Sequence, residues 1–132
     1  VSFGEGGLAS QVTGADVSTN LHGIDYLAGE DILVLSDVGD AANATDGRLY
    51  TIATASTADG LVNVQVRISG VDTLLGNPVD IAVVDGSVYV AEKSNDRVLR
   101  YDTIGTLTGE VTTAANGSLT VTKPESVFVR YE

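Results

Sequence analysis

Cysteine, methionine and tryptophan are absent from this 132-residue sequence, which holds a single histidine. Without cysteine the chain cannot form disulfides, thiolate metal sites or iron–sulfur clusters, and with one histidine we do not expect bound zinc or copper. Basic residues are also scarce, since seven Lys and Arg stand against 18 Asp and Glu and leave a net charge of −11. Because a phosphate backbone attracts a basic surface, we expect no binding to nucleic acid or to anionic membranes.

Long hydrophobic runs and helical patterns are missing as well. Hydrophobic residues make up 43% of the chain, but no apolar run approaches the roughly 20 residues that span a membrane, and no window keeps the i, i+3, i+4 spacing of an amphipathic helix. Short runs rich in β-branched and aromatic residues occur instead, separated by turn signals such as Asp-Gly. These runs cover residues 32–36, 48–52, 61–68, 79–84, 88–92, 97–101 and 126–131. The pattern predicts an all-β sandwich, barrel or propeller.

The chain also matches itself. GIDYLAGEDILVLSD, from Gly23, aligns with DIAVVDGSVYVAEK, from Asp80, and GRLYTI then aligns with DRVLRYD. The start of a third repeat lies near the C-terminus, where KPESVFVRY is similar to NPVDIAVVD. Leu21, Pro78 and Pro124 are therefore equivalent positions. Their spacing is close to the roughly 40–50 residues of a propeller blade.

Each repeat therefore reads as a four-stranded antiparallel blade. The innermost strands are expected at residues 23–27, 79–84 and 126–131, and the outermost at 61–68 and about 107–113. The expected units are residues 1–22 (an outer strand of a preceding blade, at about 7–13, and a connector), 23–76 (a blade), 77–122 (a blade) and 123–132 (the first strand of a further blade). Two blades cannot close a ring, since propellers have about 4–8. The predicted fold is thus an incomplete propeller with exposed edges at both ends, and such edges invite pairing.

The second repeat carries the fullest motif, with Pro78, DIAV, an Asp-Gly turn, VYVAE, the loop KSND and RVLRYD. In these residues the sequence resembles the NHL-repeat class of β-propellers. The usual form of that family has glycine where Asp80 stands, as Gly23 does in the first repeat, whose longer loop DVGDAANATDG replaces KSND. The resemblance covers about two blades and flanking strands, and it implies a fold much more than a function.

Candidate binding residues lie in the loops on one face of such a propeller, because functional residues concentrate in loops on a rigid scaffold. The resemblance places His22 next to the central channel. Asp80, Asn95 and Asp96 are the other candidates for this ligand face. The alternative is structural: His22 could be a polar loop residue bonded to the backbone, and Asp80 an ordinary turn residue.

The longer loop suggests calcium, the one cofactor that we consider. Calcium binds oxygen donors, and the loop offers Asp37, Asp40, Asn43 and Asp46. Their spacing matches neither the EF-hand nor the nonapeptide calcium repeat. Asp and Asn also favour turns by bonding their own backbone, so a plain loop is the second interpretation, and both stay open here.

The function that we expect is a non-enzymatic binding or structural module, an extracellular or periplasmic propeller segment. Its partners would be copies of itself, which complete each other's blades, or the remainder of a longer propeller chain; a compact β-sheet domain that does not close is a third possibility. The resemblance also implies an alternative, a part of a calcium-dependent lactonase-like six-bladed hydrolase. In that case Asn77, Asp80 and Glu125 would face the channel metal, although no catalytic nucleophile is evident.

Overall fold

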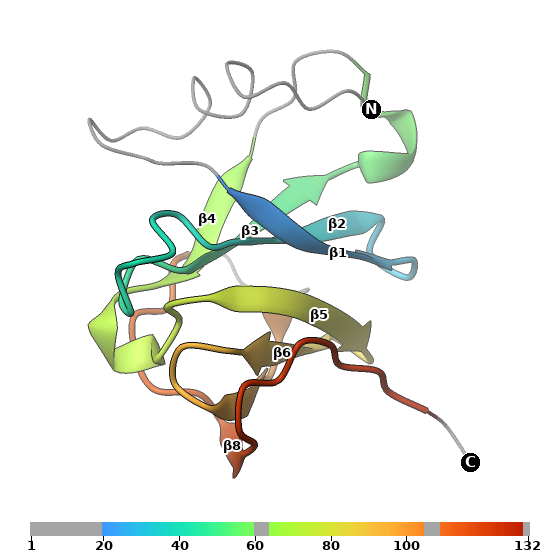
Figure 1. Ribbon diagram of the computed structural model, residues 1–132. Coiled ribbons are helices and arrows are strands. Elements are labelled where there is room, and N and C mark those ends of the chain that lie inside the picture. Colours follow the sequence, from blue (N-terminus) through green and yellow to red (C-terminus); the bar gives the residue numbers. More distant parts are fainter. Residues whose placement is uncertain (1–19, 60–63, 105–108, 131–132) are drawn as a thin grey trace.

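The computed structural model describes residues 20–59, 64–104 and 109–130, which form two four-stranded antiparallel sheets (Figure 1). The first sheet contains β1 (Leu21–Leu27), β2 (Ile32–Asp37), β3 (Arg48–Ala53) and β4 (Gln65–Ser69). The second contains β5 (Pro78–Val84), β6 (Ser87–Glu92), β7 (Arg97–Tyr101) and β8 (Gly117–Thr120). Each sheet is a simple meander in chain order. The expected all-β class and its four-stranded units are confirmed.

The connections are short. Asp85 and Gly86 join β5 to β6, and both have positive φ, 47° and 82°, which is the geometry of a tight two-residue hairpin. Single 3₁₀ turns, η1 (Ala55–Thr57) and η2 (Val71–Thr73), follow β3 and β4. No helix in the described part of the chain is long and apolar enough to cross a membrane.

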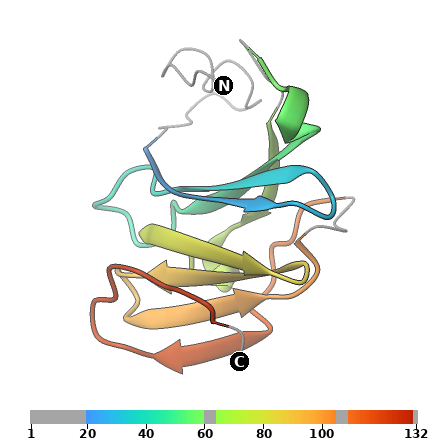
Figure 2. The same cartoon turned by 90° about the vertical axis from the view of Figure 1, so that its right-hand side faces the viewer.

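The sheets lie one above the other, with β1 and β5 as neighbours (Figure 2). The Asp25 carboxylate of β1 accepts the backbone N–H of Val83 in β5 at 2.8 Å. A Cβ at Gly23 would lie 2.9 Å from the backbone nitrogen of Ile81, so this approach requires glycine. Because these contacts advance together along both strands, β1 and β5 run in the same direction.

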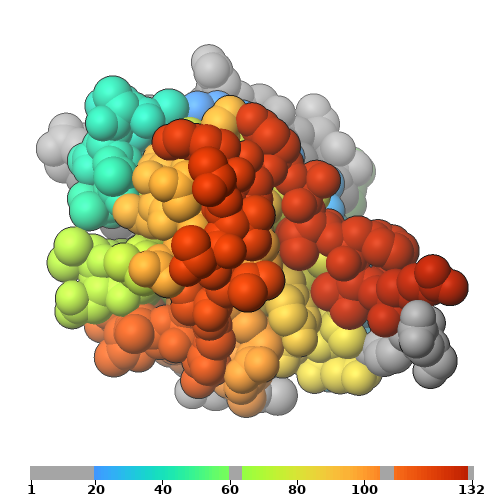
Figure 3. Space-filling model, turned by 60° about the horizontal axis from the view of Figure 1, so that its bottom comes forward, coloured from blue at the N-terminus to red at the C-terminus, as the bar shows by residue number. Residues whose placement is uncertain are grey.

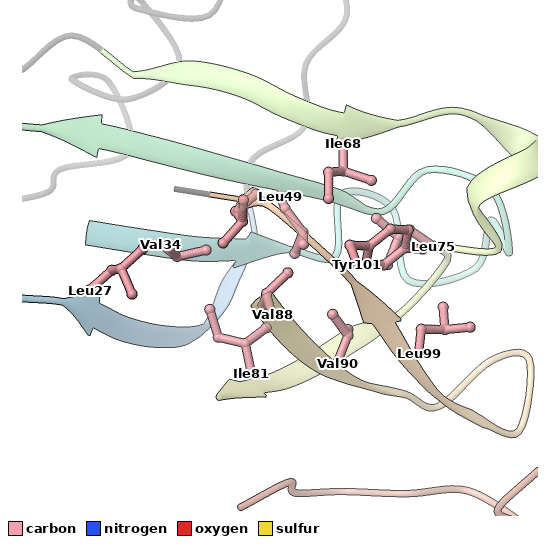
Figure 4. Close-up of a cluster of buried hydrophobic side chains, with 11 residues drawn as sticks. Leu27, Val34, Leu49, Ile68, Leu75, Ile81, Val88, Val90, Leu99 and Tyr101 are labelled. Carbon is pink, nitrogen blue, oxygen red and sulfur yellow. The ribbon is translucent and has the colours of Figure 1, made fainter. Parts of the chain in front are cut away.

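The core fills the space between the sheets (Figure 4). It consists of Leu27, Val34, Leu49 and Ile68 from the first sheet, Ile81, Val88, Val90, Leu99 and Tyr101 from the second, and Leu75 and Ile104 from the connections. A second cluster contains Leu35, Tyr50, Ile52 and Val64. Because Val34 and Leu35 are consecutive in β2, the two clusters lie on opposite faces of the first sheet.

Two strand predictions are wrong. The outermost strand of the second sheet is β8, not residues 107–113. Within that earlier segment, Val111 instead makes a parallel bridge to Ile68 in the first sheet, where its N–H donates to the Arg67 carbonyl at 2.6 Å. Val111 is therefore paired with the first sheet, and the strand that follows the turn at Asn116 completes the second.

The second error concerns the C-terminal strand. Residues 126–130 are extended but form no ladder with the described strands. The segment is attached through the Val127 N–H, which donates to the Asp80 carboxylate at 2.9 Å. A strand needs a paired neighbour, and none of the described strands pairs with this segment. The outer strand expected at 7–13 lies outside the described residues, as do residues 61–63 of the strand expected at 61–68.

The close approach at Gly23 gives a stability prediction. Replacing Gly23 by Val forces a side chain against the Ser36 hydroxyl and the backbone of β5, and we expect the free energy of unfolding to fall by about 1–3 kcal/mol. A Cβ at Gly29 would meet no atom within 4 Å, so Gly29→Ala, the control, should change it by less than about 0.5 kcal/mol. Urea unfolding measures both. Equal effects of the two substitutions would contradict the close contact between β1 and β5.

Candidate functional site

A buried carboxylate ends the second strand of the first sheet. Asp37 is fully buried and accepts the backbone N–H groups of Asn20 at 2.7 Å and Gly39 at 2.8 Å. Its other oxygen accepts the hydroxyl of Tyr50 at 2.7 Å. Burial and this hydrogen bond raise the pKa of Tyr50 above its ordinary range. Asp37 thus joins the start of β1, the end of β2 and the loop that follows.

The second sheet repeats this arrangement with Glu92. Glu92 is fully buried and accepts N–H groups from Gly76 at 3.0 Å, from Asn77, and from Asn95 at 2.8 Å. Leu21 pairs with Asp37 across the first sheet, and Pro78 pairs with Glu92 across the second, so the two carboxylates are equivalent. We call this arrangement the carboxylate clasp. Our reading of the sequence missed the clasp, although acidic residues at the ends of two matching apolar strands were its signal.

The four proposed calcium donors accept hydrogen bonds from neighbouring groups. Asp37 belongs to the clasp; Asp40 accepts the Ala42 N–H at 3.0 Å, and Asn43 accepts the Thr45 N–H at 3.0 Å. Asp46 accepts the Asp40 N–H at 2.8 Å. In the described part of the chain, no three His, Cys, Asp or Glu side chains form a group that could hold a metal ion. Calcium binding stays a prediction, and the geometry favours the turn interpretation.

The ligand-face candidates do not converge. His22 is exposed near the start of β1, whereas the Asp80 side chain of β5 holds Val127. Asn95 and Asp96 are bonded to the backbone: the Asn95 amide donates to the Leu74 carbonyl at 2.8 Å, and Asp96 accepts the Lys123 N–H at 2.9 Å.

Two of the three side chains of the hydrolase alternative are engaged elsewhere. Glu125 forms an ion pair with Lys93, and Asp80 holds the backbone of the C-terminal segment. Asn77 donates its backbone N–H to Glu92, whereas its side-chain Oδ1 is buried without a hydrogen-bond partner among the described residues. This leaves the open surfaces as the places where a partner could bind.

A groove opens on the outer face of the second sheet, beside residues 126–130. It has a volume of about 780 Å³, and its lining includes Tyr89, Val98, Leu119 and Phe128. Figure 3 shows this side of the molecule, where the red C-terminal residues lie over orange ones of the second sheet. Leu119 is 63% exposed and Phe128 is 84% exposed. Exposed side chains of this size beside a groove indicate an interaction surface.

The opposite end of the stack also exposes apolar side chains. Ile24 and Tyr26 of β1 are 56% and 43% exposed. They alternate with Gly23 and Asp25, which contact β5, so they point away from the second sheet. The Tyr26 hydroxyl donates to Asp31 at 2.7 Å. The two open ends, rather than a polar pocket, are the candidate site.

Comparison with protein-family models, curated proteins and solved structures finds no match to this chain. The candidate site therefore rests on geometry.

The clasp predicts a large effect from a single substitution. Glu92→Ala leaves three N–H donors without their acceptor, and we expect the free energy of unfolding to fall by about 3 kcal/mol. Glu92→Gln should cost less, because it keeps one acceptor oxygen but places an NH₂ group against one of the donors.

Glu125→Ala is the matched control, since it removes an acidic side chain from an exposed ion pair and should cost at most about 1 kcal/mol. Guanidinium unfolding compares the three variants. If the two alanine variants lose the same stability, the clasp has no special role.

Because two tyrosines are buried, we expect the protein to unfold at alkaline pH. Burial raises the pKa of Tyr50 and also that of Tyr101, where the charge of Glu92 adds to the effect. A tyrosine in the unfolded chain ionises near pH 10, whereas these two phenols stay neutral in the folded protein at higher pH. The free energy of unfolding therefore keeps its full value below about pH 10 and decreases as the pH rises further.

Phenolate absorbance measures this titration. Two of the five tyrosines should ionise only as the protein unfolds, and Tyr50→Phe should remove one of them. Reversible ionisation of all five near pH 10, with the fold intact, would contradict the burial of these phenols.

Proposed function

We propose that this chain is a non-enzymatic binding module, a segment of an NHL-like β-propeller with two blades and a C-terminal segment in the position where a third would begin. Its unfinished ends associate with other protein, either copies of the same chain or the remainder of a longer propeller. An acidic surface with a net charge of −11 suits an extracellular or periplasmic setting.

This proposal rests on a hydrogen bond between successive inner segments that occurs twice. Asp25 of β1 accepts the N–H of Val83 in β5, and Asp80 of β5 accepts the N–H of Val127. In each case a carboxylate on one inner segment reaches the backbone of the next inner segment. Residues 126–130 thus lie on β5 as β5 lies on β1, which is what the first strand of a third blade would do.

The carboxylate clasp supports the same proposal. Asp37 and Glu92 hold equivalent backbone groups in the two sheets, so the sheets are copies of one structural unit rather than two halves of an unrelated sandwich. Stacking of equivalent units with unfinished ends is typical of repeat architectures, in which a terminal unit exposes the surface that its neighbour would cover.

Light scattering after size-exclusion chromatography tests the proposal. We expect masses that are multiples of the 13.6 kDa chain mass, with larger species as the concentration rises, because exposed apolar ends pair more often when more chain is present. A monomer at every concentration would rule out association between copies. Asp80→Asn is an informative variant, since it weakens the attachment of residues 126–130 and should reduce the assembled fraction.

A further inference from the structure

The two open ends expose positions that are buried inside the stack. In the alignment of repeats, Ile24 of β1 corresponds to Ile81 of β5, and both point toward the preceding unit. Ile81 is 4% exposed because β1 covers it, whereas Ile24 is 56% exposed. Among the described residues, the first sheet therefore presents an uncovered copy of a surface that is buried one unit further along the chain.

At the C-terminal end of the stack, Phe128 is exposed where the equivalent residue of β5 is buried. Phe128 corresponds to Ala82 of β5, and both point toward the following unit. Ala82 is 8% exposed beneath the C-terminal segment, whereas Phe128 is 84% exposed. Val127 and Val129, on either side of it, are half-buried and line the groove with residues of the second sheet. Phe128 thus stands where contact with a next inner strand is expected.

The charges at the two ends are complementary. Five of the seven basic residues lie in or after the second sheet; they are Lys93, Arg97, Arg100, Lys123 and Arg130. Arg100 and Arg130 line the groove itself; Arg100 is paired with Asp102 at 3.0 Å, so Arg130 supplies the groove's positive charge. At the other end, the turn after β1 carries Glu30 and Asp31, and hydrogen bonds from Tyr26 and Ser56 lower the pKa of Asp31, which keeps it ionised.

We propose that a second copy of this chain docks head to tail, with the Ile24 and Tyr26 face of its β1 on Phe128 and the groove of the first copy. This inference rests on the proposed function and names the two surfaces that meet. The contact repeats the step from β1 to β5 and brings the acidic turn of one copy to the basic groove of the next. Since the two surfaces differ, the contact propagates until it closes a ring or forms a filament.

Two variants that each block one end test the arrangement. We call the Ile24 and Tyr26 face the head, and Phe128 with its groove the tail. Ile24→Asp places a charge on the head, and Phe128→Asp places one on the tail. Both positions are exposed, so we expect both variants to fold, which circular dichroism checks. Each head-to-tail contact needs one intact head and one intact tail. In a solution of either variant alone, one of these surfaces is blocked in every copy, so light scattering should give the monomer mass. An equimolar mixture keeps one intact head and one intact tail, and should give a dimer and nothing larger.

Val71→Asp is the matched control. Val71 is an apolar residue of η2 that is 64% exposed and belongs to neither end, so this variant should assemble as the unsubstituted chain does. Assembly that survives Ile24→Asp but not Phe128→Asp would indicate a symmetric contact through the groove and would overturn the head-to-tail arrangement. A mixture of the two variants that stays monomeric would overturn it as well.

Self-association, the part of the proposed function on which this inference rests, fails by a different result. If the unsubstituted chain is monomeric at every concentration, self-association itself is absent, and with it any head-to-tail contact. If the unsubstituted chain assembles and neither variant at the two ends changes its mass, self-association stands and only the named surfaces are wrong.

Discussion

The fold depends on two buried carboxylates, because Asp37 and Glu92 fix where each inner strand begins. Each accepts backbone N–H groups from the residue before the inner strand and from the loop after the second strand. These donors offset the cost of placing a charge in the interior. Neither carboxylate has an ion-pair partner among the described residues. The clasp thereby holds two strands and a loop of each sheet in one register.

Register then determines how the sheets stack. Once the start of β1 is fixed, alternation directs Gly23 and Asp25 to the second sheet and leaves Ile24 and Tyr26 on the outer face. Glycine allows the backbones to approach closely, and the Asp25 carboxylate then reaches the N–H of Val83. An equivalent contact forms one unit later, where the Asp80 carboxylate accepts the N–H of Val127. The exposed ends are therefore a consequence of how the interior is built.

The sequence predicted the regular parts well and the irregular parts poorly. Runs of β-branched residues located β2, β3, β6 and β7, because each of these strands is buried and paired within its own repeat. Residues 117–120 were missed because two neighbouring segments have strand-like residues, and only the pairing of Val111 with Ile68 in the first sheet decides which of them joins the second. A carboxylate oxygen looks the same in the sequence whether it accepts an N–H or binds calcium, so the role of Asp37 could not be predicted. The exposure of Phe128 depends on its neighbours in space, which no local pattern encodes.

Net charge bears on which surfaces of such a chain can meet. With a charge of −11, two copies repel each other over most of their surfaces, and salt screens this repulsion only beyond about 8 Å. A contact must therefore combine apolar burial with a local excess of positive charge. The groove beside residues 126–130 offers Phe128 and the cationic Arg130, while Arg100 is paired with Asp102; the turn after β1 is acidic. The acidic turns of two copies repel each other, whereas an acidic turn attracts Arg130, so the charge distribution favours a contact with one direction.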